Sequence, residues 1–270
     1  MLEQLNGETR LHFIVGDPIA QVKSPAGVTR EFAARGHNAL VVPAHVAPEH
    51  LSAWHAGLSR AQNVDGIIVT VPHKFAAFGL CASASERATF LHAVNTMRRN
   101  ADGSWHGDMF DGLGFVEAMR NNGSEPRGKR VLLVGAGGAG SAIAHALLLA
   151  GVSTLALADT SKLRRTTLID RLNWQKTAPV THGPTDPTDH DIVLNATPMG
   201  MKEGDPYPAD VTKLNAEMFV GCVITAPAVS PLIAAAREQG CATMTGADMF
   251  ARVRDLMVDF LLAATAPSAE

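Results

Sequence analysis

The segment RVLLVGAGGAGSAIAHALLLAG (130–151) restricts the possible folds more than any other part of the chain. It begins with an apolar run of Val and Leu, continues into a glycine-rich turn, and is then rich in Ala and Leu until Gly151. Such a succession favours a short buried strand, a tight turn and a helix closed by glycine. The segment therefore predicts one β-α unit of an α/β sheet.

The same succession recurs on both sides of this segment. Alternating strands and helices argue for parallel sheets with helices on both faces. Residues 95–107 break the rhythm, because a central ADG there predicts a hairpin turn between two short strands. Apolar runs and helical patterns predict strands at 11–16, 39–46, 65–72, 154–159, 190–198 and 221–227, and helices at 25–36, 48–60 and 161–175.

The length of 270 residues is enough for two modest domains. We expect an N-terminal α/β domain with a mostly parallel sheet in residues 1–111, completed by the last helix within 246–270. A Rossmann-type α/β domain would occupy residues 112–245. The two domains would join near residues 108–116.

Charge and composition exclude several classes of partner. The net charge is −3 and no basic run occurs, so nucleic acid is a poor partner. The 3 cysteines form no CxxC pair, which argues against a metal site and fits a reducing cytoplasm. The apolar runs are too short to span a membrane, and the N-terminus lacks a signal-peptide pattern. We expect a cytoplasmic protein, monomer or homodimer, whose partner is a small-molecule substrate.

The glycine-rich turn has the G-x-G-x-x-G spacing of a dinucleotide-binding motif. Gly135 permits the tight turn, Gly137 lets a pyrophosphate approach the backbone, and Gly140 lets the helix pack close to the strand. The N–H groups and the positive dipole end of the helix would hold the phosphates. A packing turn without a ligand is the alternative. The whole motif comprises Gly135, Ala136, Gly137, Gly138, Ala139 and Gly140.

Asp159 ends the next strand, about 20 residues beyond the turn. A carboxylate there accepts hydrogen bonds from the ribose 2′-hydroxyl and repels a 2′-phosphate. Thr160 follows it directly, whereas Arg164 and Arg165 lie further on, where we expect a solvated helix face. The pattern predicts NAD rather than NADP as the cofactor, unless Asp159 serves only as a helix cap.

Lys74 is the candidate for proton transfer. It follows a strand that ends in VTVP, at the carboxyl end where α/β enzymes keep their sites. An enzyme that oxidises an alcohol with a nicotinamide cofactor needs a group to take the hydroxyl proton, and a lysine shielded from water can serve. An ordinary surface lysine is the alternative.

Seven motifs occur in order along nearly the whole chain. They are GDPIAQVKSP (16–25), VTVPHK (69–74), AVNT (93–96), GDMFDG (107–112), GAGGAG (135–140), NATPMGM (195–201) and GADMF (246–250). In these motifs the chain resembles the shikimate dehydrogenase family, whose members reduce 3-dehydroshikimate reversibly with a nicotinamide cofactor. The resemblance implies an N-terminal substrate domain, a Rossmann-type NAD(P)-binding domain and an active site in the cleft between them.

The resemblance also implies roles for individual residues. Lys74 and Asp111 match the family's catalytic pair, in which Asp111 would orient the ammonium and accept a hydrogen bond from a substrate hydroxyl while Lys74 exchanges the proton. Asn95, Thr70 and Ser24 match positions that contact substrate. Beside the cofactor the resemblance places Asn195, Ala196, Thr197, Pro198 and Met201, and we also expect Thr160 and Gly246 there with Asp159.

Several positions of the expected substrate pocket depart from the family's pattern. Val22 stands where the family has a serine that binds the substrate carboxylate, and Met109 and Phe110 replace Asn and Thr. A buried polar group without a partner costs roughly 1–3 kcal/mol, so we do not expect shikimate to bind unchanged. The remaining departures are Ile68, Thr225 and Val253, where Asn, Tyr and Gln are usual.

Two accounts of these departures remain open. In the first, which we favour, the chain is a divergent paralogue that acts on a less polar or differently substituted ring alcohol, or weakly on shikimate or quinate. In the second, Arg252, Arg254, His73 or Lys23 binds the carboxylate in a new pose. A non-catalytic NAD-binding sensor on the same scaffold is a further alternative, although retention of Lys74 and Asp111 argues against it. A dehydrogenase of the methylene-tetrahydrofolate type fits the AVNT and GDxxDG motifs less well.

Overall fold

The computed structural model describes residues 5–263, and its contacts divide the chain into two compact units. Unit 1 extends to Phe110 and resumes at Arg254, and unit 2 comprises Asp111–Val253. The chain therefore passes between the units twice. A helix, α5 (Asp111–Asn121), begins where we expect the domains to join.

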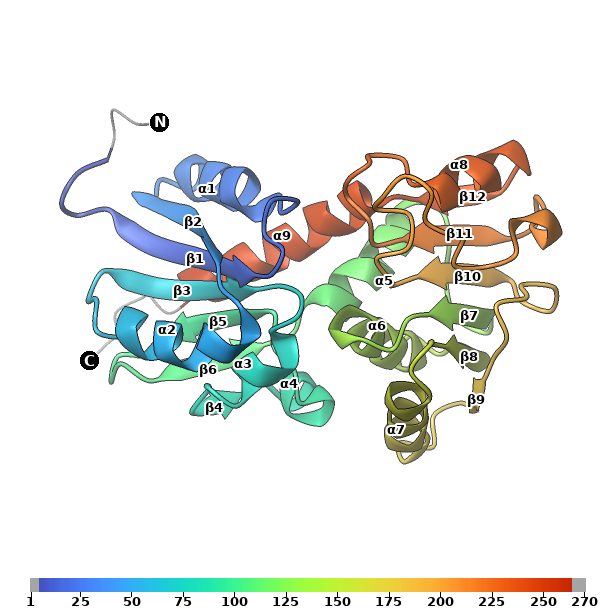
Figure 1. Cartoon of the computed structure of the whole chain (residues 1–270), viewed down its shortest axis with the longest axis horizontal. Coiled ribbons are helices and arrows are strands. Elements are labelled where there is room, and N and C mark those ends of the chain that lie inside the picture. Colours follow the sequence, from blue (N-terminus) through green and yellow to red (C-terminus); the bar gives the residue numbers. More distant parts are fainter. Residues whose placement is uncertain (1–4, 264–270) are drawn as a thin grey trace. The chain divides into compact units, whose positions relative to one another are not determined.

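Unit 1 is built around a mixed sheet with the strand order β2-β1-β3-β5-β6-β4 (Figure 1). Strands β1, β2 and β3 are parallel, and β5 and β6 form the antiparallel hairpin that the ADG turn predicts. The central strands are apolar on both faces, as expected for strands covered by helices on both sides. The bounds are β1 (Arg10–Gly16), β2 (Ala39–His45), β3 (Val64–Val69), β4 (Ser83–Ala84), β5 (Thr96–Arg99) and β6 (Trp105–Asp108).

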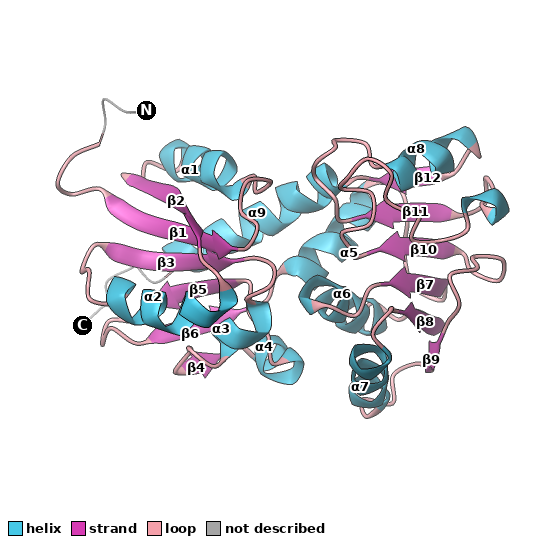
Figure 2. Ribbon diagram, in the orientation of Figure 1, coloured by secondary structure: helices cyan, strands magenta, loops and turns pink. Residues whose placement is uncertain are grey.

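Helices cover the two faces of this sheet. Figure 2 shows α2 in front of the sheet and α9 behind it. Pro25 and Pro48 stand in the first turns of α1 and of a short 3-10 turn, where the missing N–H group costs nothing. The elements are α1 (Ser24–Ala34), the 3-10 turn η2 (Pro48–His50), α2 (Leu51–Leu58), α3 (Lys74–Phe78), α4 (Glu86–Leu91) and α9 (Gly246–Leu262).

Unit 2 contains a parallel sheet with the strand order β12-β11-β10-β7-β8-β9, stacked from top to bottom in Figure 1. Strand β7 lies in the middle and leads into the glycine-rich turn and α6, as the sequence predicts. The strands are β7 (Arg130–Val134), β8 (Thr154–Ala158), β9 (Val180–His182), β10 (Ile192–Asn195), β11 (Phe219–Cys222) and β12 (Ala242–Met244).

The helices of unit 2 pack at close range because of two glycines in α5. A Cβ added at Gly112 would lie 2.1 Å from the carbonyl oxygen of Ala142, and one at Gly114 would lie 2.4 Å from Val253. The final glycine of the GDMFDG motif is thus required by helix packing. The elements are α5, α6 (Gly138–Leu149), α7 (Lys162–Asn173), the 3-10 turn η3 (Val211–Lys213) and α8 (Pro231–Glu238), with the first turns of α9.

Candidate active site and nucleotide-binding turn

Lys74 lies at the carboxyl edge of the unit 1 sheet, as the sequence predicts. Strand β3 ends at Val69, and Lys74 is the first residue of α3 and is half-buried. Its carbonyl oxygen accepts a hydrogen bond from the N–H of Val94 at 3.0 Å. Thr70, on the loop between, donates its N–H to the carbonyl of Val15 on β1 at 3.0 Å. The backbone around Lys74 is therefore fixed from two sides.

Asn95 joins this edge to the turn that precedes Asp111. Its backbone N–H donates to the carbonyl of Asp108 at 2.9 Å, and its carbonyl accepts from Val69 N–H at 2.7 Å. The side-chain Oδ1 accepts from the N–H of Phe110 at 3.0 Å and from the Thr96 hydroxyl at 3.1 Å. Oδ1 of Asn95 is therefore engaged twice within unit 1.

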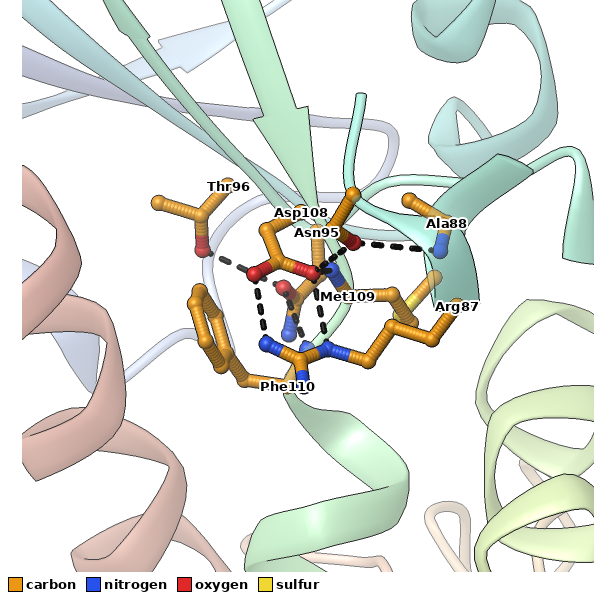
Figure 3. A network of polar contacts seen from close by, with 8 residues as sticks. Arg87, Ala88, Asn95, Thr96, Asp108, Met109 and Phe110 are labelled. Carbon is orange, nitrogen blue, oxygen red and sulfur yellow. Dashed lines mark hydrogen bonds and ion pairs between the residues drawn. The ribbon is translucent and has the colours of Figure 1, made fainter. Parts of the chain in front are cut away.

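The carboxylate of Asp108 is the centre of a polar cluster that sequence reasoning missed (Figure 3). It is 5% exposed and accepts from Nε of Arg87 at 2.8 Å, from Nη2 of Arg87 at 2.5 Å, from the Ser85 hydroxyl and from Met109 N–H at 2.7 Å. Ser85 also caps α4 by accepting from Ala88 N–H. The SER sequence at 85–87 is the signal available, since a capping serine precedes an arginine by two residues.

Met109 and Phe110 are buried, at 1% and 5% exposure. The guanidinium of Arg87 lies over the Phe110 ring, 5.1 Å from its centroid, and the ring meets Phe260 edge-on at 5.4 Å. Arg98 lies on Phe260 in turn, at 4.8 Å. The apolar pair that departs from the family pattern is thus packed into unit 1.

His73 is not the solvated side chain considered from the sequence. It is 1% exposed, and its Nε2 bonds the carbonyl of Val46 at 2.8 Å. His73 is therefore buried just before α3, and its ring contacts the backbone of Val46. Arg254, which was also considered as a group that binds the substrate carboxylate, pairs with Asp255 at 2.6 Å.

The other residues expected to contact substrate occupy varied positions. In unit 1, Ser24 is buried at the start of α1, Val22 is half-buried just before it, and Ile68 is 3% exposed within β3. In unit 2, Thr225 is half-buried after β11, and Val253 is 5% exposed and packs against Gly114.

The glycine-rich turn has the geometry that the motif predicts. Gly135 has a φ of +112°, which only glycine adopts readily, and a Cβ at Gly140 would lie 2.0 Å from the Gly135 carbonyl oxygen. A Cβ at Gly137, by contrast, would meet no heavy atom within 4 Å. Gly137 is the N-cap of α6 and makes no side-chain cap, so open space lies beside the first helical N–H groups. These residues fit a pyrophosphate.

Asp159 is connected directly to this turn. One carboxylate oxygen accepts from Ala136 N–H at 2.8 Å, and the other accepts from Ser161 N–H at 2.7 Å. Desolvation raises the pKa of Asp159, but these N–H groups and Arg164 outweigh it and the pKa is lowered. Asp159 is therefore an ionised group at the end of β8, and Thr160 beside it is exposed.

Arg164 is exposed and Arg165 half-buried, and both also contact Asp159. Nη2 of Arg164 lies 3.0 Å from the carboxylate of Asp159, and Nη1 of Arg165 donates to its backbone carbonyl at 3.0 Å. Helix α7 begins immediately after β8, so its first turn folds back over the strand end. Positive charge therefore lies beside the acidic residue.

The NATPMGM loop runs next to the glycine turn. A Cβ at Gly135 would lie 2.8 Å from the backbone of Ala196, with Thr197 at 3.0 Å. Asn195 is fully buried, and its Oδ1 accepts from the N–H and the hydroxyl of Thr197 while Nδ2 donates to the carbonyl of Met199 at 3.2 Å. The Asn195 side chain therefore holds the loop.

The remaining cofactor candidates lie near this loop in sequence or at the start of α9. Pro198 is exposed, and Met201 is half-buried against the core cluster of unit 2. Gly246 lies against the backbone of Ile224, where a Cβ would come within 2.2 Å of the carbonyl oxygen. Among residues 5–263, no helix has the length and apolar character needed to cross a bilayer, and no cluster of His, Cys, Asp and Glu side chains could hold a metal ion.

The chain has curated relatives of similar length. A family model described as the shikimate dehydrogenase substrate binding domain matches residues 14–97. A relative from Rubrobacter xylanophilus, named shikimate dehydrogenase (NADP(+)), is 38% identical over 248 residues, 90% of this chain and 87% of the relative. The chain belongs to the shikimate dehydrogenase family. Another member with the same name, from Lysinibacillus sphaericus, is 32% identical over 88% of this chain and 86% of its own.

Several solved structures share the fold. A quinate dehydrogenase from Corynebacterium glutamicum in complex with NAD is 29% identical, with a TM-score of 0.82 over 94% of both chains. A shikimate 5-dehydrogenase from Listeria monocytogenes, in complex with shikimate and NAD, is 26% identical with a TM-score of 0.85, covering 97% of this chain and 95% of its own. A 5-ketofructose reductase of Gluconobacter is 26% identical with a TM-score of 0.83, covering 96% and 94%.

These comparisons confirm three predictions. The resemblance in the motifs reflects membership of the family. The fold is α/β, with an N-terminal mostly parallel sheet and a Rossmann-type second sheet. The chain is an oxidoreductase of the shikimate dehydrogenase type that uses NAD or NADP.

Proposed function

We propose that this chain catalyses reversible hydride transfer between a nicotinamide cofactor and a ring hydroxyl of shikimate, quinate or a related cyclic alcohol, with Lys74 and Asp111 as the catalytic pair. One observation carries the assignment. The Lys74 carbonyl bonds Val94, and the next residue, Asn95, bonds both Asp108 and Phe110, which directly precedes Asp111. One short segment therefore holds the backbone on which each proposed catalytic residue depends.

The proposed chemistry assigns roles to Lys74, Asp111 and Asn95. In the direction of oxidation, the Lys74 amine takes the proton of the reacting hydroxyl, and in reduction the ammonium returns it. Asp111 orients the ammonium and accepts a hydrogen bond from a neighbouring substrate hydroxyl. Asn95 donates from Nδ2 to a ring oxygen. The bound nicotinamide supplies the hydride acceptor or donor.

The substrate range is proposed to be shifted from that of the shikimate-specific relatives. Val22 offers no hydrogen-bond donor, and Ile68 presents only hydrocarbon, so a substrate with fewer polar substituents would lose less by being buried here. The structural neighbours named for quinate and for 5-ketofructose support a wider set of substrates than shikimate alone. We therefore favour a divergent member that handles shikimate weakly.

NAD is the proposed preferred cofactor. The carboxylate of Asp159 is fixed by Ala136 and Ser161 and is ionised, so a 2′-phosphate would meet negative charge at the end of β8. Arg164 is already paired with that carboxylate. The curated relatives are named for NADP(+), which makes this preference a point on which the chain would differ from them.

Substrate binding and nucleotide binding are proposed to belong to different units. We propose that residues 1–111 with 246–270 bind the substrate and that residues 112–245 bind the nucleotide. The contacts separate the chain close to these limits, at Phe110 and at Val253. We expect the enzyme to act in the cytoplasm as a monomer or homodimer.

A turnover screen tests the proposal. Shikimate, quinate and less oxygenated ring alcohols are offered with NAD and with NADP, and the reduced cofactor is followed at 340 nm, roughly its absorbance maximum. We expect turnover of at least one ring alcohol, and loss of that turnover by about 10³-fold or more in Lys74→Met with unchanged affinity for NAD. Lys129→Met, which removes an exposed lysine of unit 2, is the control and should behave like the parent.

Two results would contradict the proposal. If Lys74→Met turned over its best substrate like the parent, the catalytic pair would be wrong. If every ring alcohol were inert while calorimetry showed micromolar NAD binding, the chain would be an NAD-binding sensor on the family's scaffold.

A further inference from the structure

Asp111 follows a turn whose backbone is fixed by side chains that do not belong to the proposed catalytic pair. The N–H of Met109 donates to the Asp108 carboxylate at 2.7 Å, and the N–H of Phe110 donates to Oδ1 of Asn95 at 3.0 Å. The two residues before Asp111 thus have both amide groups held by buried carboxylate and amide oxygens. The backbone that leads directly into Asp111 is therefore held by these two acceptors.

Arg87 determines where the first of these acceptors lies. Its Nε and Nη2 form a two-pronged contact with the Asp108 carboxylate, which is almost fully buried. A planar guanidinium imposes a fixed orientation on a carboxylate when it binds through two parallel hydrogen bonds. The carboxylate then presents one oxygen to the N–H of Met109.

The same guanidinium also covers Phe110. Its Cζ lies 5.1 Å from the ring centroid, and the ring also meets Phe260 of α9 in an edge-type contact. Arg87 therefore contacts the turn both through Asp108 and through the ring of Phe110 (Figure 3). A small side chain at position 110 could not fill the space between Arg87 and Phe260.

We infer that Arg87 and Phe110 are positioning residues for Asp111 and that Phe110 acts through packing. In this arrangement the ring of Phe110 packs against both Arg87 and Phe260. Neither residue needs to touch the substrate to affect catalysis. This inference rests on the proposed function of Asp111.

The inference predicts that catalysis and stability respond differently to substitution. Arg87→Lys keeps the positive charge beside Asp108 but loses the two-pronged contact and the planar cover over Phe110. Arg87→Met removes the charge, and Phe110→Leu removes the ring. We expect kcat to fall at least tenfold in each variant, while KM for the substrate and Kd for NAD change less than threefold.

The measurement uses the full-length protein and the ring alcohol with the highest turnover in the screen described above. Each variant is assayed well below its Tm, with folding checked by circular dichroism. Arg10→Lys is the matched control, because Arg10 makes a two-pronged contact with Asp65 on the exposed surface of the same unit. It should leave kcat unchanged. In Arg87→Lys we expect Tm to recover most of what Arg87→Met loses, without recovery of kcat.

The double variant Arg87→Met/Phe110→Leu should lose no more kcat than the worse of its two single variants, because both residues act on one turn. A folded Arg87→Lys or Phe110→Leu protein with kcat within twofold of the parent would overturn the inference. So would recovery of kcat in step with Tm. Lys74→Met is assayed in parallel: if it retains turnover, the proposed function fails, whereas an inactive Lys74→Met beside normal positioning variants removes only this inference.

Discussion

The carboxylate of Asp159 accepts a hydrogen bond from the N–H of Ala136 at 2.8 Å, which ties the end of β8 to the glycine turn that follows β7. The acidic residue is thus part of the turn's structure as well as a candidate ribose ligand. Both roles depend on an ionised carboxylate, and the lowered pKa of Asp159 provides one at neutral pH.

Replacing Asp159 by Ser should invert the preference between the two cofactors. The change removes the negative charge and leaves Arg164 and Arg165 beside the strand end, where they can meet a 2′-phosphate. We expect the ratio of kcat/KM for NADP to that for NAD to rise by about tenfold or more, roughly 1.4 kcal/mol. Steady-state kinetics with both cofactors measure it.

Asp191→Ser is the control for this change. Asp191 also accepts from a backbone N–H and pairs with an arginine, Arg130, but it precedes β10 at the opposite end of the strand from the turn. Its replacement should leave the cofactor ratio as in the parent. A parent enzyme that already prefers NADP by tenfold would refute the role given to Asp159.

Two glycines of the turn should respond in opposite ways. At Gly140 an added Cβ collides with the Gly135 carbonyl, so Gly140→Ala should lower the free energy of unfolding by about 1–3 kcal/mol. At Gly137 an added side chain meets nothing and a serine is a favourable N-cap, so Gly137→Ser should preserve or slightly raise stability. Its side chain would occupy the space in which a pyrophosphate is expected, and the Kd for NAD should rise at least tenfold.

Urea unfolding and calorimetric titration with NAD separate these effects. Gly57, an exposed-side glycine of α2 with no heavy atom near its Cβ position, provides the control in Gly57→Ala. Unchanged NAD affinity in Gly137→Ser would show that phosphate does not bind at this helix terminus.

Buried His12 should make the protein less stable in mild acid. It is 2% exposed, and burial lowers its pKa from 6.5 to about 4, against a smaller opposing effect of Asp65. The folded protein therefore does not bind the proton that the unfolded chain takes up. Its contribution to stability is complete above pH 6.5 and is lost as the pH falls toward 4, by about 3 kcal/mol in total.

The difference between urea midpoints at pH 7 and pH 4.5 should shrink in His12→Leu. Leucine fills a similar volume beside Phe32, whose ring lies 4.6 Å from the imidazole, and cannot take up a proton. His50→Gln changes an exposed histidine and should leave the pH dependence as it is. An identical acid dependence in His12→Leu and the parent would contradict the assignment.

Local signals made much of the fold predictable. The ADG turn gave the hairpin of β5 and β6, because a tight turn fixes its own strands. The strand, glycine turn and helix at 130–151 were equally predictable from the sequence, since each part depends on neighbouring residues only. The role of Gly112 could not be predicted, because the residue that leaves no room for a Cβ there is Ala142, on another helix.

Two missed features of the site depend on partners distant in the chain. Arg87 meets Asp108 only because α4 lies beside β6, and His73 is buried only because Val46 presents its carbonyl. Arg164 is nearer to Asp159 in sequence, yet its pairing depends on how sharply α7 begins after β8. Residue type gave the candidates, but tertiary packing decided which side chains were exposed and which were paired.

Helix α9 also bears on the order in which the molecule can be made. Its first turns belong to unit 2, and the rest of it lies in unit 1, where Leu261 fits against Gly66 and Asp259 pairs with Arg35. Unit 2 is complete once Val253 has left the ribosome, whereas the unit that begins the chain still needs the residues that follow. The sheet that is synthesised first is therefore closed only after unit 2 has been synthesised, when the residues that follow Val253 have been added.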